Sequence, residues 1–324
     1  MSDSTVSRGA GSTIARGTFA RLVAAGAAGG VAIGIPSLAS AQDQTGFGKP
    51  HAPVVAENDP AIRVDRTAIN YLDETSNTQR KLNAYAAYPR QMTAKTPGVV
   101  VIQAIWGVDS QLRDTVRRFA REGYMAIAPD LYTGLTTISG DGATDYSPFR
   151  DVAAKLSDQQ VDRDLRAAAT TLRVKAAKLR RGGSNDPKLL AQKIAAVGFC
   201  MGGSIALRQA IDNGDVFQAV AVFYGKVRYG TTGNNGTVTP IALTYANDIV
   251  APFLGSFGEK DTSIVADDVR ALDGRLTQIN KPHDIKVYAE AGHAFFDDTR
   301  DSYVASAATD AWARTLAWFH SNVS

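Results

Sequence analysis

The sequence is poor in the residues that most often hold metals or form cross-links. Its 324 residues include one cysteine and four histidines, and no Cys-x-x-Cys or His-x-x-x-His pair occurs. A single cysteine cannot form a disulfide within the chain, and scattered histidines do not predict a metal site. We therefore expect no metal and no other cofactor, and a thiol-redox role would require a second molecule.

An excess of one charge is also missing. The chain has 35 Lys and Arg against 32 Asp and Glu, for a formal net charge of +3, and no run of basic residues exceeds two. Nucleic-acid-binding proteins present basic patches, so nucleic acid is not an expected partner. The ordinary composition is that of a soluble globular protein, and the length allows one large core or two small ones.

Long hydrophobic runs are absent too. The longest apolar stretch, at 22–35, has 14 residues, whereas a membrane span needs about 20. Arg16-Gly17 precedes the stretch in a degenerate twin-arginine pattern, and the small-x-small sequence at 39–41 follows it. We expect residues 1–41 to be a cleaved export signal rather than a membrane anchor, and the protein to be periplasmic or secreted without stable membrane insertion.

After a Gly/Pro-rich segment at 42–60, predicted to be a linker, short apolar runs alternate with helical patterns up to residue 324. This alternation predicts one α/β domain over 61–324, with a mostly parallel central sheet, helices on both faces and an antiparallel N-terminal edge. Strands are predicted at 61–69, 82–88, 99–102, 124–128, 193–199, 217–223, 252–257 and 284–289, and helices at 112–122, 147–181, 203–213, 263–279 and from about 302.

The cysteine lies in the most informative motif of the chain, Gly198-Phe199-Cys200-Met201-Gly202-Gly203. The motif follows a predicted strand and precedes a predicted helix, as in the nucleophile elbow G-x-Nuc-x-G, with sulfur in place of serine oxygen. Small neighbours let such a sharp turn close and expose the nucleophile. Most lone cysteines are buried structural residues, but these flanking glycines favour Cys200 as a nucleophile.

A thiol nucleophile needs a base, which an acid orients. Of the four histidines, only His293 follows a parallel strand, at the carboxyl edge where α/β sites lie; His51, His283 and His320 are predicted to be surface residues. Asp261 follows the preceding strand and fits the chain order nucleophile, acid, histidine. The competing acids are Glu259, and Asp267 and Asp268 within the next helix.

An oxyanion hole needs two backbone donors. The amide after the nucleophile, Met201, is one, and the loop after the strand 99–102 supplies the other, for which Ile105 is the candidate. Trp106 is either a pocket wall or part of the core. The loop 229–240 is either a lid or a surface connection.

With these residues assembled, the chain resembles the dienelactone hydrolase (carboxymethylenebutenolidase) family from about residue 98 to the end. The segments that carry the resemblance are 103–108, 123–132, 198–203, 223–225, 258–261, 291–293 and 303–308. The resemblance implies an α/β-hydrolase fold and a Cys200–His293–Asp261 triad. It also implies hydrolysis of a small lactone or ester through a thioester, without a cofactor. Arg150 and Phe295 are further candidates for the substrate pocket.

Two positions depart from the family pattern. Ala104 stands where the family has a glutamate that holds the resting thiol, so we expect Cys200 to pair directly with His293. Asp297 stands where the dienelactone enzymes have an arginine that binds the substrate carboxylate, so an anionic dienelactone would meet a negative charge.

Two other roles compete with the hydrolase. The missing glutamate is compatible with a weakly catalytic or non-catalytic binding protein built on the same scaffold. A thiol-redox protein would lack a resolving cysteine. We expect a monomer or a small homo-oligomer acting on a small molecule.

Overall fold

The computed structural model describes residues 52–179, 193–227, 230–232, 238–240 and 244–324. The predicted export signal, His51 and half of the loop 229–240 lie outside the described residues. Among the residues that are described, no helix has the length and apolar character needed to cross a membrane.

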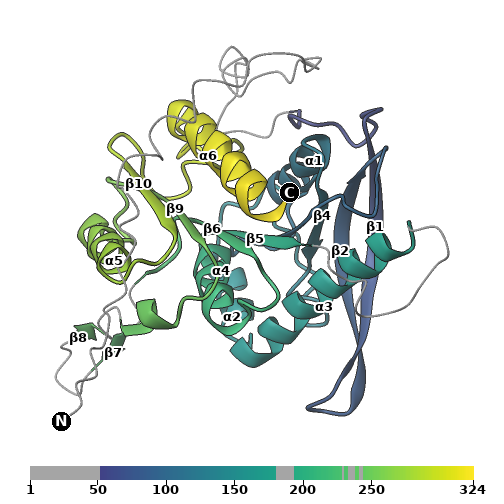
Figure 1. The fold of residues 1–324 in the computed structure, drawn as a ribbon, viewed down its shortest axis with the longest axis horizontal. Helices are drawn as coiled ribbons and strands as arrows, with labels where there is room; N and C mark the ends of the chain where they lie inside the picture. Colours follow the sequence, from purple (N-terminus) through teal and green to yellow (C-terminus); the bar gives the residue numbers. More distant parts are fainter. Residues whose placement is uncertain (1–51, 180–192, 228–229, 233–237, 241–243) are drawn as a thin grey trace, which may run out of the picture. The chain divides into compact units, whose positions relative to one another are not determined.

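An eight-stranded sheet forms the centre of the domain (Figure 1), in the order β1-β2-β4-β3-β5-β6-β9-β10. The strands β1 and β2 pair antiparallel and β2 pairs antiparallel with β4, whereas the other neighbours are parallel. The strands are β1 (Ile62–Asp73), β2 (Thr78–Pro89), β3 (Gly98–Ile102), β4 (Met125–Pro129), β5 (Ile194–Phe199), β6 (Ala219–Phe223), β9 (Phe253–Gly258) and β10 (His283–Tyr288). The predicted fold class, with its antiparallel N-terminal edge, is confirmed.

Helices cover both faces of this sheet (Figure 1). They are α1 (Ser110–Arg121), α2 (Ser147–Ala153), α3 (Asp158–Ala177), α4 (Met201–Asp212), α5 (Ala266–Gln278) and α6 (Ala305–Val323). Side chains of α1 and α6 pack in one core layer, and those of α3, α4 and α5 pack in the other. The central strands β3, β4, β5 and β6 are buried along their whole length, as parallel strands covered on both faces must be.

The single helix predicted over 147–181 is wrong. The structure breaks it into α2 and α3, because Ser157 has extended backbone angles and its hydroxyl accepts a hydrogen bond from the amide of Gln160. Serine at an N-cap position competes with helix continuation in this way. Within the predicted loop 229–240, Gly230–Thr232 (β7) and Val238–Pro240 (β8) pair as a small antiparallel sheet.

The end of the predicted linker belongs to the domain. Val55 is 1% exposed, and the amides of Val54 and Val55 donate to the buried carboxylate of Asp114 on α1. An ion pair of 3.1 Å joins Asp59 to Arg121 at the other end of this segment. Residues 53–59, which we call the N-terminal strap, are therefore fixed to α1 rather than free.

Candidate active site

The predicted nucleophile elbow lies where β5 meets α4. Cys200 is the N-cap of α4 and has φ 55° and ψ −116°, a strained conformation for a residue with a side chain. Its side chain is partly exposed, and its amide donates to the carbonyl of Phe223 on β6 at 3.0 Å. Cys200 thus lies at the carboxyl edge of the sheet, where β5 ends and α4 begins.

Glycine is required on both sides of the elbow for steric reasons. A Cβ at Gly198 would lie 1.9 Å from the carbonyl oxygen of Gly202, and a Cβ at Gly202 would lie 2.4 Å from the carbonyl oxygens of Ile102 and Gln103. All three contacts are with backbone atoms, which cannot rotate away as side chains do. The sequence motif therefore follows from the tight passage of the chain between β3, β5 and α4.

Three side chains far apart in the sequence meet at this edge. The Nε2 atom of His293 lies 3.0 Å from the Sγ atom of Cys200, and its Nδ1 atom lies 2.7 Å from Oδ2 of Asp261. Asp261 follows β9 and His293 follows β10, so the parallel strands bring both residues to the elbow. The arrangement has the order and the contacts of a nucleophile, base and acid.

Asp261 is held more firmly than the other two side chains. Its side chain is fully buried, and its Oδ1 atom accepts hydrogen bonds from the amides of Ser263 and Ile264 at 2.8 and 3.0 Å. Only Oδ2 then remains for the imidazole. The competing acid Glu259 is exposed and pairs with Arg270 on α5, which removes it from the site.

The electrostatics of the site favour a protonated imidazole at His293. Burial lowers the pKa of His293, but the hydrogen bonds to Asp261 and Cys200 and the negative charges of both outweigh it and raise this pKa to about 10. The imidazole thus holds its proton through neutral pH beside the sulfur. A thiolate next to an imidazolium is the reactive form of a catalytic cysteine.

The other histidines described lie elsewhere. His283 begins β10 and makes a 3.2 Å contact with Asp273, and His320 is exposed near the end of α6. Within the described part of the chain, no group of three or more potential metal ligands occurs.

The two expected oxyanion donors belong to segments that meet. Met201 is the first residue of α4, where the helix supplies no acceptor for its amide. Ile105 lies in a turn that closes with a 3.2 Å hydrogen bond from the Gly107 amide to the Ala104 carbonyl. Ile105 and Met201 pack together with Phe149 and Tyr132 in a small apolar cluster.

The predicted pocket residues have different surroundings. Trp106 is partly exposed, packs edge-on against Phe149 at 5.4 Å, and has the guanidinium of Arg300 3.9 Å from its ring centroid. Arg150 is exposed on α2, with its guanidinium 6.0 Å from the ring of Tyr146. In the described part of the chain, these ring and guanidinium contacts of Trp106 and Arg150 are made with Phe149, Arg300 and Tyr146, and not with Cys200, His293 or Asp261.

Phe295 is a core residue rather than a pocket wall, which corrects the prediction. Its side chain is fully buried and lies 5.4 Å from Tyr224 and 5.2 Å from Tyr288 between ring centroids. Tyr224 in turn lies 5.3 Å from the ring of His293. The aromatic side chains therefore support the histidine loop from behind. From its position two residues after His293, the sequence could not show whether Phe295 faces the pocket or the core.

Asp297 does not present a free negative charge. It is 8% exposed, and its carboxylate accepts hydrogen bonds from Thr299 and from Nε of Arg300. Burial raises the pKa of Asp297, and burial together with the nearby Asp297 raises that of Asp109 to about 7. The negative charge expected at position 297 is thus paired with the guanidinium of Arg300.

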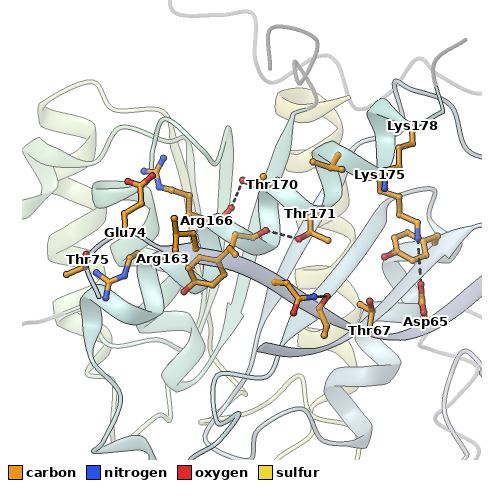
Figure 2. A pocket seen from close by; sticks show the side chains of 17 residues that line it. Asp65, Thr67, Glu74, Thr75, Arg163, Arg166, Thr170, Thr171, Lys175 and Lys178 are labelled. Atoms are coloured by element: carbon orange, nitrogen blue, oxygen red, sulfur yellow. Dashed lines mark hydrogen bonds and ion pairs between the residues drawn. The ribbon is translucent and has the colours of Figure 1, made fainter. Parts of the chain in front are cut away.

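A large cavity of about 870 Å³ lies away from this site, between β1 and α3 (Figure 2). Ten of its polar residues are labelled in the figure, and the ion pair of Lys175 with Asp65 crosses it at 3.7 Å. Cys200, His293 and Asp261 do not line it. This cavity is therefore separate from the candidate active site.

Comparison with known proteins identifies relatives of this chain. The model of the dienelactone hydrolase family matches residues 82–323. A Yersinia pestis protein that carries the provisional name carboxymethylenebutenolidase is 40% identical over 244 residues, which are 74% of this chain and 83% of that protein.

Solved structures show the same fold. A Klebsiella pneumoniae crystal structure, provisionally named a dienelactone hydrolase, has a TM-score of 0.63 and 35% identity, and the match covers 80% of this chain and 99% of that one. A Pyrococcus furiosus esterase has a TM-score of 0.52 at 14% identity, covers 86% of this chain and 100% of its own, and supports the fold alone.

Proposed function

Because the chain belongs to the dienelactone hydrolase family and is a carboxylic ester hydrolase, we propose that it hydrolyses small lactones or esters with Cys200 as the nucleophile. The observation that carries this proposal is the 3.0 Å contact between Sγ of Cys200 and Nε2 of His293. The elbow conformation of Cys200 and the buried Asp261 behind His293 support the same assignment.

The first half-reaction forms a thioester. The thiolate of Cys200 attacks the carbonyl carbon, and the carbonyl oxygen becomes an oxyanion that the amides of Met201 and Ile105 stabilise. One such donor contributes about 3 kcal/mol to the transition state. When the carbon–oxygen bond breaks, the imidazolium of His293 gives its proton to the leaving alkoxide, which in a lactone remains attached to the acyl group.

The second half-reaction releases the acid. His293, now neutral, removes a proton from water, and the resulting hydroxide attacks the thioester carbon. The carbon–sulfur bond breaks, the carboxylic acid leaves, and the thiolate–imidazolium pair is restored. Asp261 keeps the imidazole in the tautomer that both steps need.

The site favours a nucleophile that is active before substrate arrives. Ala104 has no carboxylate to hold the thiol, and Cys200 already contacts His293. Since Arg300 neutralises Asp297, the carboxylate of Asp297 does not by itself repel an anionic substrate. Neutral small lactones and esters are nevertheless the proposed substrates, because position 297 offers no cation for a substrate carboxylate.

A substrate panel tests the proposal. Neutral and anionic lactones and aryl esters are assayed with wild type, Cys200→Ala and Cys200→Ser. The expected result is turnover of neutral compounds that Cys200→Ala abolishes. Unchanged hydrolysis by Cys200→Ala would refute the mechanism, and tight binding of lactones without turnover by wild type would support a binding protein instead.

We also propose that residues 1–41 direct export and are removed. The sequence 39–41 and the short apolar stretch support this proposal. Sequencing the N-terminus of protein recovered from the periplasm or medium should give Gln42. An unprocessed N-terminus in the cytoplasm would contradict it.

A further inference from the structure

Tyr132 lies beside both residues that are proposed to bind the oxyanion. It follows β4 at the carboxyl edge of the sheet, next to β3, and is 3% exposed. Its hydroxyl donates to the carbonyl of Ile105 at 2.9 Å and lies 3.8 Å from Sδ of Met201. One side chain thus links the loop after β3 to the start of α4.

The bond to Ile105 acts on the turn that presents the amide of this residue. The turn runs from Ala104 to Gly107, and the Ile105 carbonyl belongs to its central peptide. Gly107 has φ 78°, and a Cβ there would lie 3.4 Å from the ring of Tyr132, so the ring also packs against the turn. A hydrogen bond to the central peptide fixes the direction of the backbone on either side of it.

The tyrosine is itself held in place. The amide of Leu131 donates to the side-chain carbonyl of the fully buried Gln103 at 3.0 Å, and the amide of Tyr132 donates to Asp130. The segment 130–132 is therefore tied to the loop after β3 by its backbone as well as by the hydroxyl. Burial raises the pKa of Tyr132 well above its ordinary value, so the hydroxyl keeps the proton that it donates.

We infer that Tyr132 is a positioning residue whose hydroxyl fixes the Ile105 half of the oxyanion hole and contacts the side chain of Met201, which supplies the other half. The inference rests on the proposed function, since it assigns a purpose to the amides of Ile105 and Met201. Tyr132 acts through these residues and does not bind the substrate. Oxyanion donors contribute only when they are fixed before charge develops, so a loosened turn costs rate rather than substrate affinity.

The experiment uses Tyr132→Phe, which keeps the ring and removes the hydroxyl. We expect kcat for a small aryl ester to fall about ten-fold with little change in KM, a part of the 10²–10³ lost when a donor is removed outright. The affinity for a small aldehyde should fall by the same factor, because its adduct with the thiol places an oxyanion in the hole. The rate of Cys200 alkylation by iodoacetamide should not change, since displacement at a saturated carbon forms no oxyanion.

Tyr124→Phe is the matched control. Tyr124 is also buried, but it precedes β4 at the opposite edge of the sheet. It should leave all three measurements unchanged.

Two results would overturn the inference. One is a kcat and an aldehyde affinity of Tyr132→Phe within two-fold of wild type. The other is an alkylation rate that falls in parallel with kcat, which would mean that the hydroxyl supports the nucleophile rather than the hole. A failure of the proposed function would be seen separately, because Cys200→Ala would then keep its activity.

Discussion

Replacing Asp261 by asparagine tests the orientation of the base. The two side chains have the same shape, but asparagine has one oxygen and one NH₂ group. In the structure, one oxygen of Asp261 accepts from the amides of Ser263 and Ile264, and the other contacts Nδ1 of His293 at 2.7 Å. The asparagine must therefore turn its NH₂ group either to the histidine or to the two amides.

The hydrogen-bond count decides between these orientations. An NH₂ group facing the two amides would leave both without this acceptor, and the buried Ile264 amide alone would cost about 1–3 kcal/mol. An NH₂ group facing His293 avoids this cost, but it requires Nδ1 to be an acceptor. The imidazole proton then sits on Nε2 and points at Cys200, so the histidine cannot take the thiol proton.

We expect kcat/KM of Asp261→Asn to fall about 10³- to 10⁴-fold, as in other triads that lose the correct tautomer. Alkylation of Cys200 by iodoacetamide at pH 7 should slow at least ten-fold, while the urea midpoint changes little because the shape is conserved. The matched control is Glu259→Gln, an exposed neighbour paired with Arg270, which should behave as wild type. If Asp261→Asn kept kcat/KM within ten-fold and its alkylation rate, Asp261 would not orient the base.

Three further predictions follow from other contacts. Gly198→Ala should abolish activity and lower the urea midpoint, because the new Cβ would lie 1.9 Å from a backbone oxygen. Gly274→Ala, in open space within α5, should instead raise stability by about 1 kcal/mol. Equal effects of the two substitutions would contradict the elbow geometry. Folding raises the pKa of His293 to about 10, so the protonated imidazole stabilises the folded state. Urea unfolding of wild type and His293→Gln should show this stabilisation in full below pH 6.5 and its loss as the pH rises through about 10. A stabilisation that grows with pH would mean that folding lowers this pKa instead. Deleting residues 1–60 removes two amide hydrogen bonds to Asp114 and the buried side chain of Val55. Because Asp114 keeps its ion pairs with Arg117 and Arg118, the cost is that of the two hydrogen bonds and the buried valine, about 3–5 kcal/mol of unfolding free energy, while deleting 1–41 should cost nothing. Equal stability of both deletions would show that the N-terminal strap is dispensable.

Much of the fold could be predicted because its signals are local. Buried parallel strands appear as short apolar runs, such as 99–102 and 193–199, and the helices between them as amphipathic segments. The elbow could be predicted for the same reason, since the steric demand for Gly198 and Gly202 falls on neighbours in the sequence. Chain order then assigned Asp261 and His293 to the ends of successive strands.

What escaped prediction depends on contacts between distant segments. Tyr132 gained its place from a hydrogen bond to Ile105, 27 residues earlier in the chain. The ring of Trp106 contacts the guanidinium of Arg300, which lies almost two hundred residues later in the chain. The N-terminal strap has the composition of a linker. Its attachment could not be predicted, because the carboxylate that binds it lies about sixty residues later, on α1.

The proposed nucleophile can be observed directly by rapid acid quenching during turnover of 4-nitrophenyl acetate, followed by intact-mass and peptide mass spectrometry. The account predicts one acetyl group per chain, on the peptide that contains Cys200, and none in Cys200→Ala. An acetyl group on another residue, together with turnover that survives in Cys200→Ala, would contradict it.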